Sequence, residues 1–374
     1  MKKILFFIES LVGGGAEKSL TELIESLDKS KYDITAVTVA DGDFFTQRVR
    51  DACRYRCFAQ KCEPGRPVKS FLNKITVKFS ATAPAKMVYG LLIGGKYDVE
   101  VAYCEGYATK LIAHSTNPKS RKIAFVHTDM QKNHWTQFVF GSLEEEIKCY
   151  EKFDIISCVS ETVAQAFKNT FGITKNVVVN MNPVRGDLIA EKSKEASGLE
   201  KIDCLRMITA GSLTPVKAFG RLLKVAGRLK NEGCRFELLI LGEGEEKQNL
   251  ERYIETHDLS GCVKLMGFQE NPYKFLADSD FFVCSSLAEG LSIAATESII
   301  IGKPVVTTDC SGMAELFGGF ECGVICGNSE DDLFKALKNV LDNPACLQKY
   351  GEHLKLRAAS FDINRSVREI EKMF

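Results

Sequence analysis

Several features that mark other classes of protein are missing from this chain of 374 residues. It has no stretch of about 18 apolar residues, so the sequence predicts no membrane-spanning helix. The apolar run at its start, MKKILFFIES, ends at Glu9 and has no small-residue cleavage site, so it does not predict a signal peptide. We therefore expect a cytoplasmic protein, with the inner face of the cell membrane as the one alternative location.

Metal-binding cysteine patterns and an excess of charge are also absent. The 14 cysteines include no CxxC pair, and the pairs Cys53/Cys57 and Cys322/Cys326 lack the further ligands that would complete a zinc site. Scattered cysteines of this kind fit reduced thiols in the cytosol. The 49 basic residues balance 49 acidic ones, which argues against a general nucleic-acid binder.

What the chain does contain is a regular alternation of short apolar runs and amphipathic helical patterns. The apolar runs predict strands at 3–8, 34–40, 98–103, 122–127, 154–160, 205–210, 236–241, 262–266, 280–285, 304–308 and 323–326. Helical patterns fall between them, at 16–27, 217–230 and 331–341. The alternation predicts an α/β fold with two Rossmann-like domains. We place them at 1–184 and 204–345, joined by a polar linker at 185–203 and followed by a helical segment at 346–374.

The most informative stretch is 287–309, LAEGLSIAATESIIIGKPVVTTD, which holds Glu289 and Glu297 eight positions apart. On a regular helix, eight positions place two side chains about 80° apart on one face. If Glu289 precedes the helix, both carboxylates can reach one extended polar ligand, and the backbone N–H groups at 290–293 can meet an anionic group. A nucleotide-sugar offers this combination of hydroxyls and phosphates. The simpler alternative is a core helix with two incidental glutamates.

The wider segment 263–315 resembles the signature region of the retaining GT-B glycosyltransferases of family 4. The resemblance implies two Rossmann-like domains with a donor and acceptor cleft between them. It implies transfer of a sugar from a nucleotide-diphosphate sugar, UDP-linked, to a growing lipid-linked saccharide in capsule or other surface polysaccharide synthesis. In this family the last helix, here within 346–374, crosses back to the first domain. The family needs no metal, so we do not interpret Asp278-Ser279-Asp280 as a metal-binding motif, and we expect no cofactor besides the donor.

The same resemblance assigns donor-side roles. Glu297 would bind the ribose hydroxyls and Glu289 the hydroxyls of the sugar. The diphosphate would be held by Lys217 and by backbone amides at Gly14, Gly15, Gly290, Leu291 and Ser292. The family usually has an arginine where this chain has Ser212, so a second cation or a helix dipole must balance more of the phosphate charge.

Two glycine-rich turns follow predicted strands. Gly13-Gly14-Gly15-Ala16-Glu17 lacks the spacing of a dinucleotide fingerprint, but it resembles the family's donor-facing loop, with a tight strand-to-helix turn as the alternative. For Leu241-Gly242-Glu243-Gly244 we favour a turn that ends the strand at 236–241 over a phosphate loop.

A candidate catalytic residue, His127, and three candidate acceptor-side residues, Glu105, Thr109 and Asp129, lie in the first half. His127 ends the strand in RKIAFVHTDM and resembles the family histidine that touches the donor sugar, although a lone histidine is more often structural. Asp129 follows two residues later. Glu105 and Thr109, in the polar phrase YCEGYATK, are the other candidates for acceptor contact, against an ordinary first turn of a helix.

Residues 54–96 contain nine Lys or Arg residues and one acidic residue, Glu63. Phe71, Leu72, Ile75 and Phe79 share a helical face in this segment. A basic and apolar helix of this kind suits an anionic membrane surface, and the alternative is a core helix with a solvated basic face. Two other functions remain open at this point: a GT-B sugar-nucleotide epimerase, which would need further acid/base carboxylates, and a non-catalytic saccharide-binding partner of an assembly complex.

Overall fold

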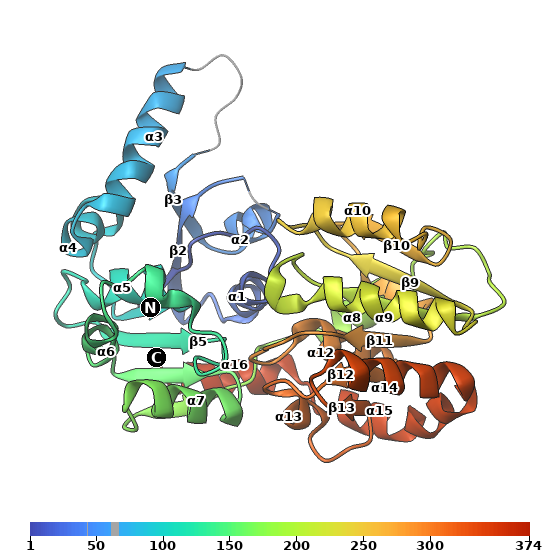
Figure 1. The fold of residues 1–374 in the computed structure, drawn as a ribbon. Coiled ribbons are helices and arrows are strands. Elements are labelled where there is room, and N and C mark those ends of the chain that lie inside the picture. The colour runs from blue at the N-terminus through green and yellow to red at the C-terminus, as the bar shows by residue number, and fades with distance from the viewer. Residues whose placement is uncertain (43, 61–66) are drawn as a thin grey trace. The chain divides into compact units, whose positions relative to one another are not determined.

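The computed structural model describes residues 1–42, 44–60 and 67–374, with no side-chain description for 67–69. Two compact units form, one from Met1–Pro183 together with Ile363–Phe374 and the other from Val184–Asp362 (Figure 1). Each unit has its own sheet, and the paired strands in both sheets are parallel. Two α/β units with parallel sheets are the Rossmann-like domains that the alternation of strands and helices predicts.

The first unit is built on a seven-stranded sheet with the order β3-β2-β1-β4-β5-β6-β7. Its strands are β1 (Lys2–Phe7), β2 (Tyr32–Ala40), β3 (Arg54–Ala59), β4 (Val99–Ala102), β5 (Arg121–Val126), β6 (Ile155–Cys158) and β7 (Val177–Val179). Its α-helices are α1 (Gly15–Ser26), α2 (Thr46–Ala52), α3 (Pro67–Thr82), α4 (Ala85–Val88), α5 (Tyr107–Ala113), α6 (Leu143–Tyr150), α7 (Glu161–Phe171) and α16 (Ile363–Glu371). The strand order reverses at β1, which lies between β2 and β4.

The second unit has a six-stranded sheet with the order β10-β9-β8-β11-β12-β13. Its strands are β8 (Leu205–Ala210), β9 (Phe236–Leu241), β10 (Val263–Gly267), β11 (Phe281–Cys284), β12 (Val305–Thr308) and β13 (Gly323–Cys326). Its α-helices are α8 (Gly186–Lys192), α9 (Phe219–Asn231), α10 (Lys247–Thr256), α11 (Tyr273–Ala277), α12 (Ile293–Ile301), α13 (Met313–Phe317), α14 (Glu330–Asp342) and α15 (Gly351–Ala358). Here the order reverses at β8, between β9 and β11.

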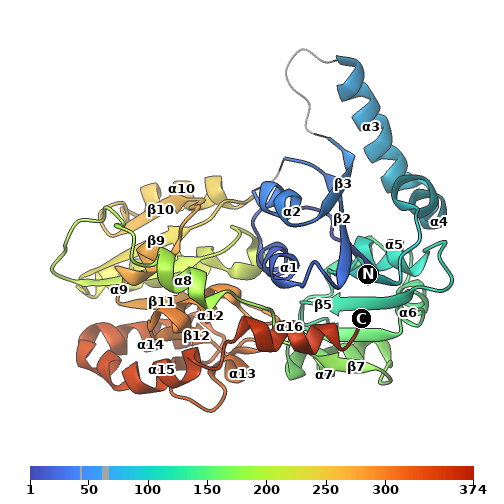
Figure 2. The ribbon, with the colours of Figure 1, turned by 180° about the vertical axis from the view of Figure 1, so that it is seen from behind.

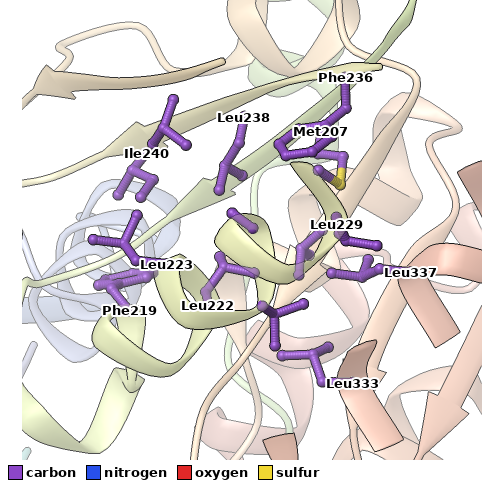
Figure 3. Packing of buried hydrophobic residues seen from close by; sticks show 14 of the residues in the cluster. Met207, Phe219, Leu222, Leu223, Leu229, Phe236, Leu238, Ile240, Leu333 and Leu337 are labelled. Atoms are coloured by element: carbon purple, nitrogen blue, oxygen red, sulfur yellow. The ribbon is translucent and has the colours of Figure 1, made fainter. Parts of the chain in front are cut away.

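The core of the second unit shows how the alternating strands and helices pack, with helices lying on the sheet. Helix α9 places Leu222, Leu223 and Leu229 against Leu238 and Ile240 of β9 (Figure 3). Leu333 and Leu337 of α14 belong to the same cluster, and all these side chains are buried. The burial of such side chains contributes roughly 1.5–3 kcal/mol each. This packing fixes the sheet whose strand ends carry the candidate site.

The C-terminal helix α16 packs into the first unit (Figure 2). Val367 and Ile370 lie in the same core cluster as β1 and α1, and the Phe374 ring contacts Phe6 edge-on at 6.1 Å between centroids. The Lys2 Nζ donates to the Phe374 carbonyl at 2.9 Å. Residues 363–374 are therefore the part of the C-terminal segment that belongs with the N-terminal half.

Two boundaries differ from the sequence expectation. The stretch 185–203 includes helix α8, which packs against α12 of the second unit, so it is not simply a linker. The return to the first unit begins at Ile363 rather than at 346, because α15 packs against α12. Both segments have enough apolar residues on one side to dock locally, for example Ile189 and Leu354, which are buried.

Candidate active site

The loops after β8 and β11 meet at the reversal point of the second sheet. In open parallel sheets, ligands bind in the crevice beyond the carboxyl ends of the strands at this point, where the connections of the two neighbouring strands lead to opposite sides. Residues 211–217 follow β8, and residues 285–292 connect β11 to α12. Sequence reasoning had selected these two segments as the donor site, and the fold brings them together.

Lys217 and Glu289 form an ion pair between these loops. The Lys217 Nζ lies 2.7 Å from the Glu289 Oε1, with side chains 27% and 9% exposed, respectively. Burial alone would lower the pKa of Lys217, but the charge and hydrogen bond of Glu289 outweigh it and raise the pKa. The lysine is therefore a fixed positive charge at the site at neutral pH.

Ser286 is a second hydrogen-bond donor to Glu289. Its hydroxyl donates to the Glu289 Oε1 at 2.6 Å, so one carboxylate oxygen accepts from both Ser286 and Lys217. The backbone joins the same two loops, since the Leu287 N–H donates to the Val216 carbonyl at 2.8 Å. Sequence reasoning missed Ser286, although a hydroxyl residue three positions before the key glutamate was a usable signal.

Helix α12 begins immediately after these residues. Ser292 is its N-cap, and the Ser292 side chain accepts a hydrogen bond from the Ala295 N–H. The remaining N–H groups of the first turn have no partners within the helix and give this end a partial positive charge. Gly312 has a φ of +79°, and a Cβ there would lie 2.1 Å from the Gly290 carbonyl oxygen. The loop at Gly290 is therefore packed closely against a second turn.

Glu297 lies in the second turn of α12 with 5% of its surface exposed. The Tyr273 hydroxyl, from the start of α11, donates to the Glu297 Oε1 at 3.2 Å. Glu289 and Glu297 are thus held by different partners on the two sides of the start of α12. Tyr273 was also missed, and since it stands 24 positions before Glu297, no local pattern could have identified it.

Ser212, at the position of the family's usual arginine, is exposed. The neighbouring turn, Leu241–Gly244, serves as a strand-end support. A Cβ on Gly242 would lie 1.9 Å from the Gly211 carbonyl oxygen, and one on Gly244 would lie 2.5 Å from that of Leu213. The two glycines permit this turn to pack directly on the loop that carries Lys217, which fits the structural interpretation.

In the first unit, His127 follows β5 and its ring is fixed. The Nε2 lies 3.0 Å from the Tyr103 carbonyl, which can only accept, so the Nε2 carries a proton. Burial lowers the pKa of His127, and the nearby Glu105 offsets part of this effect. A neutral His127 leaves its Nδ1 as an acceptor. It can therefore accept a hydrogen bond from a sugar hydroxyl.

The other first-unit candidates are engaged within the protein. Glu105 is fully buried, and its Oε1 accepts from the His127 N–H at 2.8 Å. Thr109 is also fully buried and donates to the Cys104 carbonyl at 3.2 Å. The Asp129 Oδ1 accepts from the backbone N–H groups of the next turn, at 131 and 132. Glu105 and Thr109 are thus buried and bonded within the first unit, and their contact with an acceptor stays a prediction.

The glycine turn after β1 also carries acidic side chains. Gly14 is the N-cap of α1, Gly15 is its first residue, and a Cβ on Gly14 would lie 2.3 Å from the Glu17 Oε2. Glu9 accepts from the Ala108 N–H at 2.9 Å. Burial raises the pKa of Glu9 to about 7. Sequence reasoning did not single out Glu9, since a glutamate that ends an apolar run gives no sign of its burial.

The Asp278-Ser279-Asp280 motif lies at the other end of β11. The Arg206 N–H donates to the Asp280 Oδ2 at 2.6 Å, which ties this residue to the start of β8. Within the described part of the chain, no three His, Cys, Asp or Glu side chains are grouped for a metal ion. We therefore assign these aspartates a structural role at the amino ends of the strands.

Comparison with known proteins agrees with this architecture. Residues 13–185 match the model of Glycosyltransferase Family 4, and residues 192–357 match that of Glycosyl transferases group 1. A relative from Campylobacter jejuni, N-acetylgalactosamine-N,N'-diacetylbacillosaminyl-diphospho-undecaprenol 4-alpha-N-acetylgalactosaminyltransferase, is 28% identical across 100% of this chain and 99% of its own length. The amylovoran biosynthesis glycosyltransferase AmsD of Erwinia amylovora is 23% identical over 91% of this chain and 90% of its own.

Among solved structures, Alr3699/HepE of Anabaena in complex with UDP-glucose is similar in fold. It superposes with a TM-score of 0.78 at 18% identity, covering 100% of this chain and 99% of that one. The two family models together extend over both units, and the fold is the one that the signature region implies. The chain belongs to the GT-B glycosyltransferases of family 4.

Proposed function

We propose that this glycosyltransferase moves a sugar from a UDP-sugar to a lipid-linked saccharide in polysaccharide synthesis, with retention at the anomeric carbon and without a metal. The observation that carries the proposal is the layout around α12. Lys217 pairs with Glu289 just before the N-terminus of α12, and Glu297 follows in the second turn of this helix. Each carboxylate accepts from its own hydroxyl donor. Carboxylates accept from hydroxyls, while a cation and helix amides attract phosphate.

Each part of the donor has a partner in this arrangement. Glu297, steadied by Tyr273, would accept from the ribose hydroxyls. Lys217 and the amides at Gly290, Leu291 and Ser292 would hold the diphosphate. Glu289 would accept from hydroxyls of the sugar through its second oxygen, since its Oε1 already accepts from Lys217 and Ser286.

The chemistry that follows is electrostatic. The bond between the anomeric carbon and the diphosphate oxygen breaks, and an acceptor hydroxyl attacks on the same face. Its proton passes to the leaving diphosphate. Fixed positive charge at the diphosphate lowers the barrier because it is already oriented when the negative charge develops.

The relatives support the acceptor class. The Campylobacter jejuni protein is named for transfer to a diphospho-undecaprenol-linked saccharide, in α linkage. AmsD is named for amylovoran biosynthesis. The UDP-glucose complex of HepE supports a uridine-linked donor. We extend these properties to the present chain as part of the proposal.

Helix α3 is the proposed membrane contact. Phe71, Leu72 and Ile75 are 63%, 56% and 48% exposed, and α3 extends beyond the sheet of its own unit (Figures 1 and 2). No acidic residue occurs from 64 to 97, and Lys74 and Lys78 on α3 are exposed. A core helix would bury its apolar face, so the exposure favours an anionic lipid surface. None of the helices in the described ranges is long and apolar enough to cross a bilayer, and residues 61–66 of the basic segment lie outside those ranges.

The central test is a transfer assay with a panel of nucleotide-sugars and a short lipid-linked saccharide. We expect turnover with a UDP-sugar, and a product whose anomeric configuration, measured by NMR, matches that of the donor. Inversion would refute retention. A nucleotide-sugar that returns with a changed sugar would indicate the epimerase, and donor binding without turnover would indicate the non-catalytic partner.

Membrane contact is tested by co-sedimentation with vesicles of anionic and of neutral lipid. We expect binding to the anionic vesicles, reduced by Phe71→Ser with Ile75→Ser. Leu356→Ser, which changes a 59% exposed leucine of the second unit, is the control and should bind as the wild type does. Equal binding of all variants would show that α3 is not the contact.

A further inference from the structure

Arg221 lies behind the candidate site, outside the set of donor-binding residues. It stands in the first turn of α9, four residues after Lys217. Its Nη2 donates to the carbonyls of Ser285 and Ser286, the latter at 3.2 Å. Its Nη1 donates to Asn328, at 3.0 Å to the carbonyl and 2.9 Å to the side-chain oxygen. One guanidinium thus joins the loop after β11 to the loop after β13.

Asn328 completes this contact. Its side-chain amide donates to the Leu287 carbonyl at 3.1 Å. Three consecutive carbonyls of the loop, at 285, 286 and 287, are therefore satisfied by Arg221 and Asn328. This is the loop whose next residues are Ala288 and Glu289. The planar fork of an arginine suits such a role, because it can donate in two directions at fixed angles.

The same loop is tied to Lys217 on its other side. The Ser285 hydroxyl donates to the Lys217 carbonyl at 2.9 Å, and the Thr308 hydroxyl donates to the Ser286 carbonyl at 2.7 Å. Arg221 comes from the helix that directly follows the Lys217 turn. Its bonds to the 285–287 loop therefore link this loop to the segment that carries Lys217. A small displacement of a reacting group can cost about a hundredfold in rate.

We propose that Arg221 is a positioning residue: together with Asn328 it holds the 285–287 loop so that Glu289 meets the donor sugar in the productive orientation. This inference rests on the proposed transfer reaction. It concerns Glu289, which would contact the sugar, and not Glu297, which would bind the ribose and has a separate hydroxyl donor in Tyr273.

The test compares Arg221→Gln with Arg228→Gln. Arg228 lies on the same helix and pairs with Asp331 at the surface at 2.6 Å, so the control removes the same charge from the same element. For Arg221→Gln we expect turnover to fall about tenfold to a hundredfold, while the dissociation constant of UDP changes by less than about threefold. Arg228→Gln should match the wild type in both measurements. Asn328→Ala should lower turnover in the same selective way but less, and it leaves α9 intact if Arg221→Gln fails to fold.

A double-mutant cycle identifies the path of the effect. When Arg221→Gln is added to Glu289→Gln, turnover should fall by less than about threefold relative to Glu289→Gln alone, because the carboxylate that Arg221 positions is already replaced. Full additivity, an equal loss of UDP affinity, or wild-type turnover of Arg221→Gln and Asn328→Ala would each overturn the inference. If the wild-type protein transfers no sugar from any donor, the proposed function fails, and this outcome is distinct from those.

Discussion

Replacement of Lys217 by alanine is the most direct test of the donor site. Lys217 pairs with Glu289 at 2.7 Å, and the Glu289 side chain is 9% exposed. Loss of the partner of a buried charge costs about 3–5 kcal/mol, but Lys217 is 27% exposed, so we expect the lower end, about 3 kcal/mol, at most. The loss of a charged donor to the diphosphate costs about 1.5–3 kcal/mol. This corresponds to a donor dissociation constant raised about tenfold to more than a hundredfold.

The matched control is Lys247→Ala. Lys247 pairs with Glu243 at the same 2.7 Å in the same unit, but both side chains are well exposed, at 39% and 47%. Such a pair contributes about 0–1 kcal/mol, so the control should keep its stability, donor affinity and turnover. Calorimetry with a UDP-sugar, thermal unfolding and steady-state transfer rates are the measurements. If Lys217→Ala matches Lys247→Ala in donor affinity and turnover, the diphosphate binds elsewhere, and the assignment of 211–217 to the donor site is wrong.

Four further predictions follow from particular contacts. Tyr273→Phe should weaken UDP binding about tenfold by calorimetry, because Glu297 loses a hydroxyl donor, and an unchanged affinity would remove Tyr273 from the site. Ser212→Arg should fold normally and tighten donor binding, since position 212 is exposed and an added cation would meet the diphosphate; weaker binding would contradict this. Transfer should persist in excess EDTA, and activity that depends on added manganese or magnesium would refute the metal-free site. Glu9 binds its proton more tightly in the folded state, with a pKa of about 7 against 4.5, so its contribution to stability should fall by at most about 3 kcal/mol as the pH rises from 4.5 through 7. Glu9→Gln should therefore flatten this part of the curve of unfolding free energy against pH. A variant curve that runs parallel to that of the wild type would refute the shift.

Sequence analysis located the inner strands of both sheets and also the two edge strands of the second sheet, β10 and β13. β1, β4, β9, β11 and β12 read as continuous apolar runs, because helices cover both sides of a parallel sheet. The two edge strands of the first sheet, β3 and β7, were missed. β3 has the sequence RYRCFA, with alternate arginines and a half-exposed pattern, and β7 has three residues. The sequences of β3, with its arginines, and of the short β7 therefore do not distinguish these two edge strands from loops.

In the candidate site, the residues that are close together in the sequence were predictable, and their partners from distant segments were less so. Glu289, Ser292 and Glu297 lie within nine residues, so their spacing on a helix start was visible in the sequence. Their partners come from other segments: Lys217 from the loop after β8 and Tyr273 from α11, while Arg221 of α9 bonds to the loop that precedes Glu289. Lys217 was found because the family resemblance assigns it a role. The resemblance assigned no role to Arg221 or to Tyr273, although Tyr273 lies within 263–315. Hydrogen-bond partners between segments follow from the strand order, which local patterns do not specify.

The missing arginine at Ser212 shows why residue type alone is an incomplete guide to charge at the site. Arg221 lies nine positions later, and from the sequence alone it could be taken as a substitute for the arginine that is absent at position 212. In the structure, both Nη atoms of Arg221 donate to carbonyls of the 285–286 loop and to Asn328. These bonds engage both terminal nitrogens of Arg221 in holding the loop, while its Nε is buried without a hydrogen-bond partner among the described residues. In the proposed donor site, Lys217 and the amides at the start of α12 would balance the diphosphate charge, and we expect this site to depend more on a single lysine than a family member with both cations would.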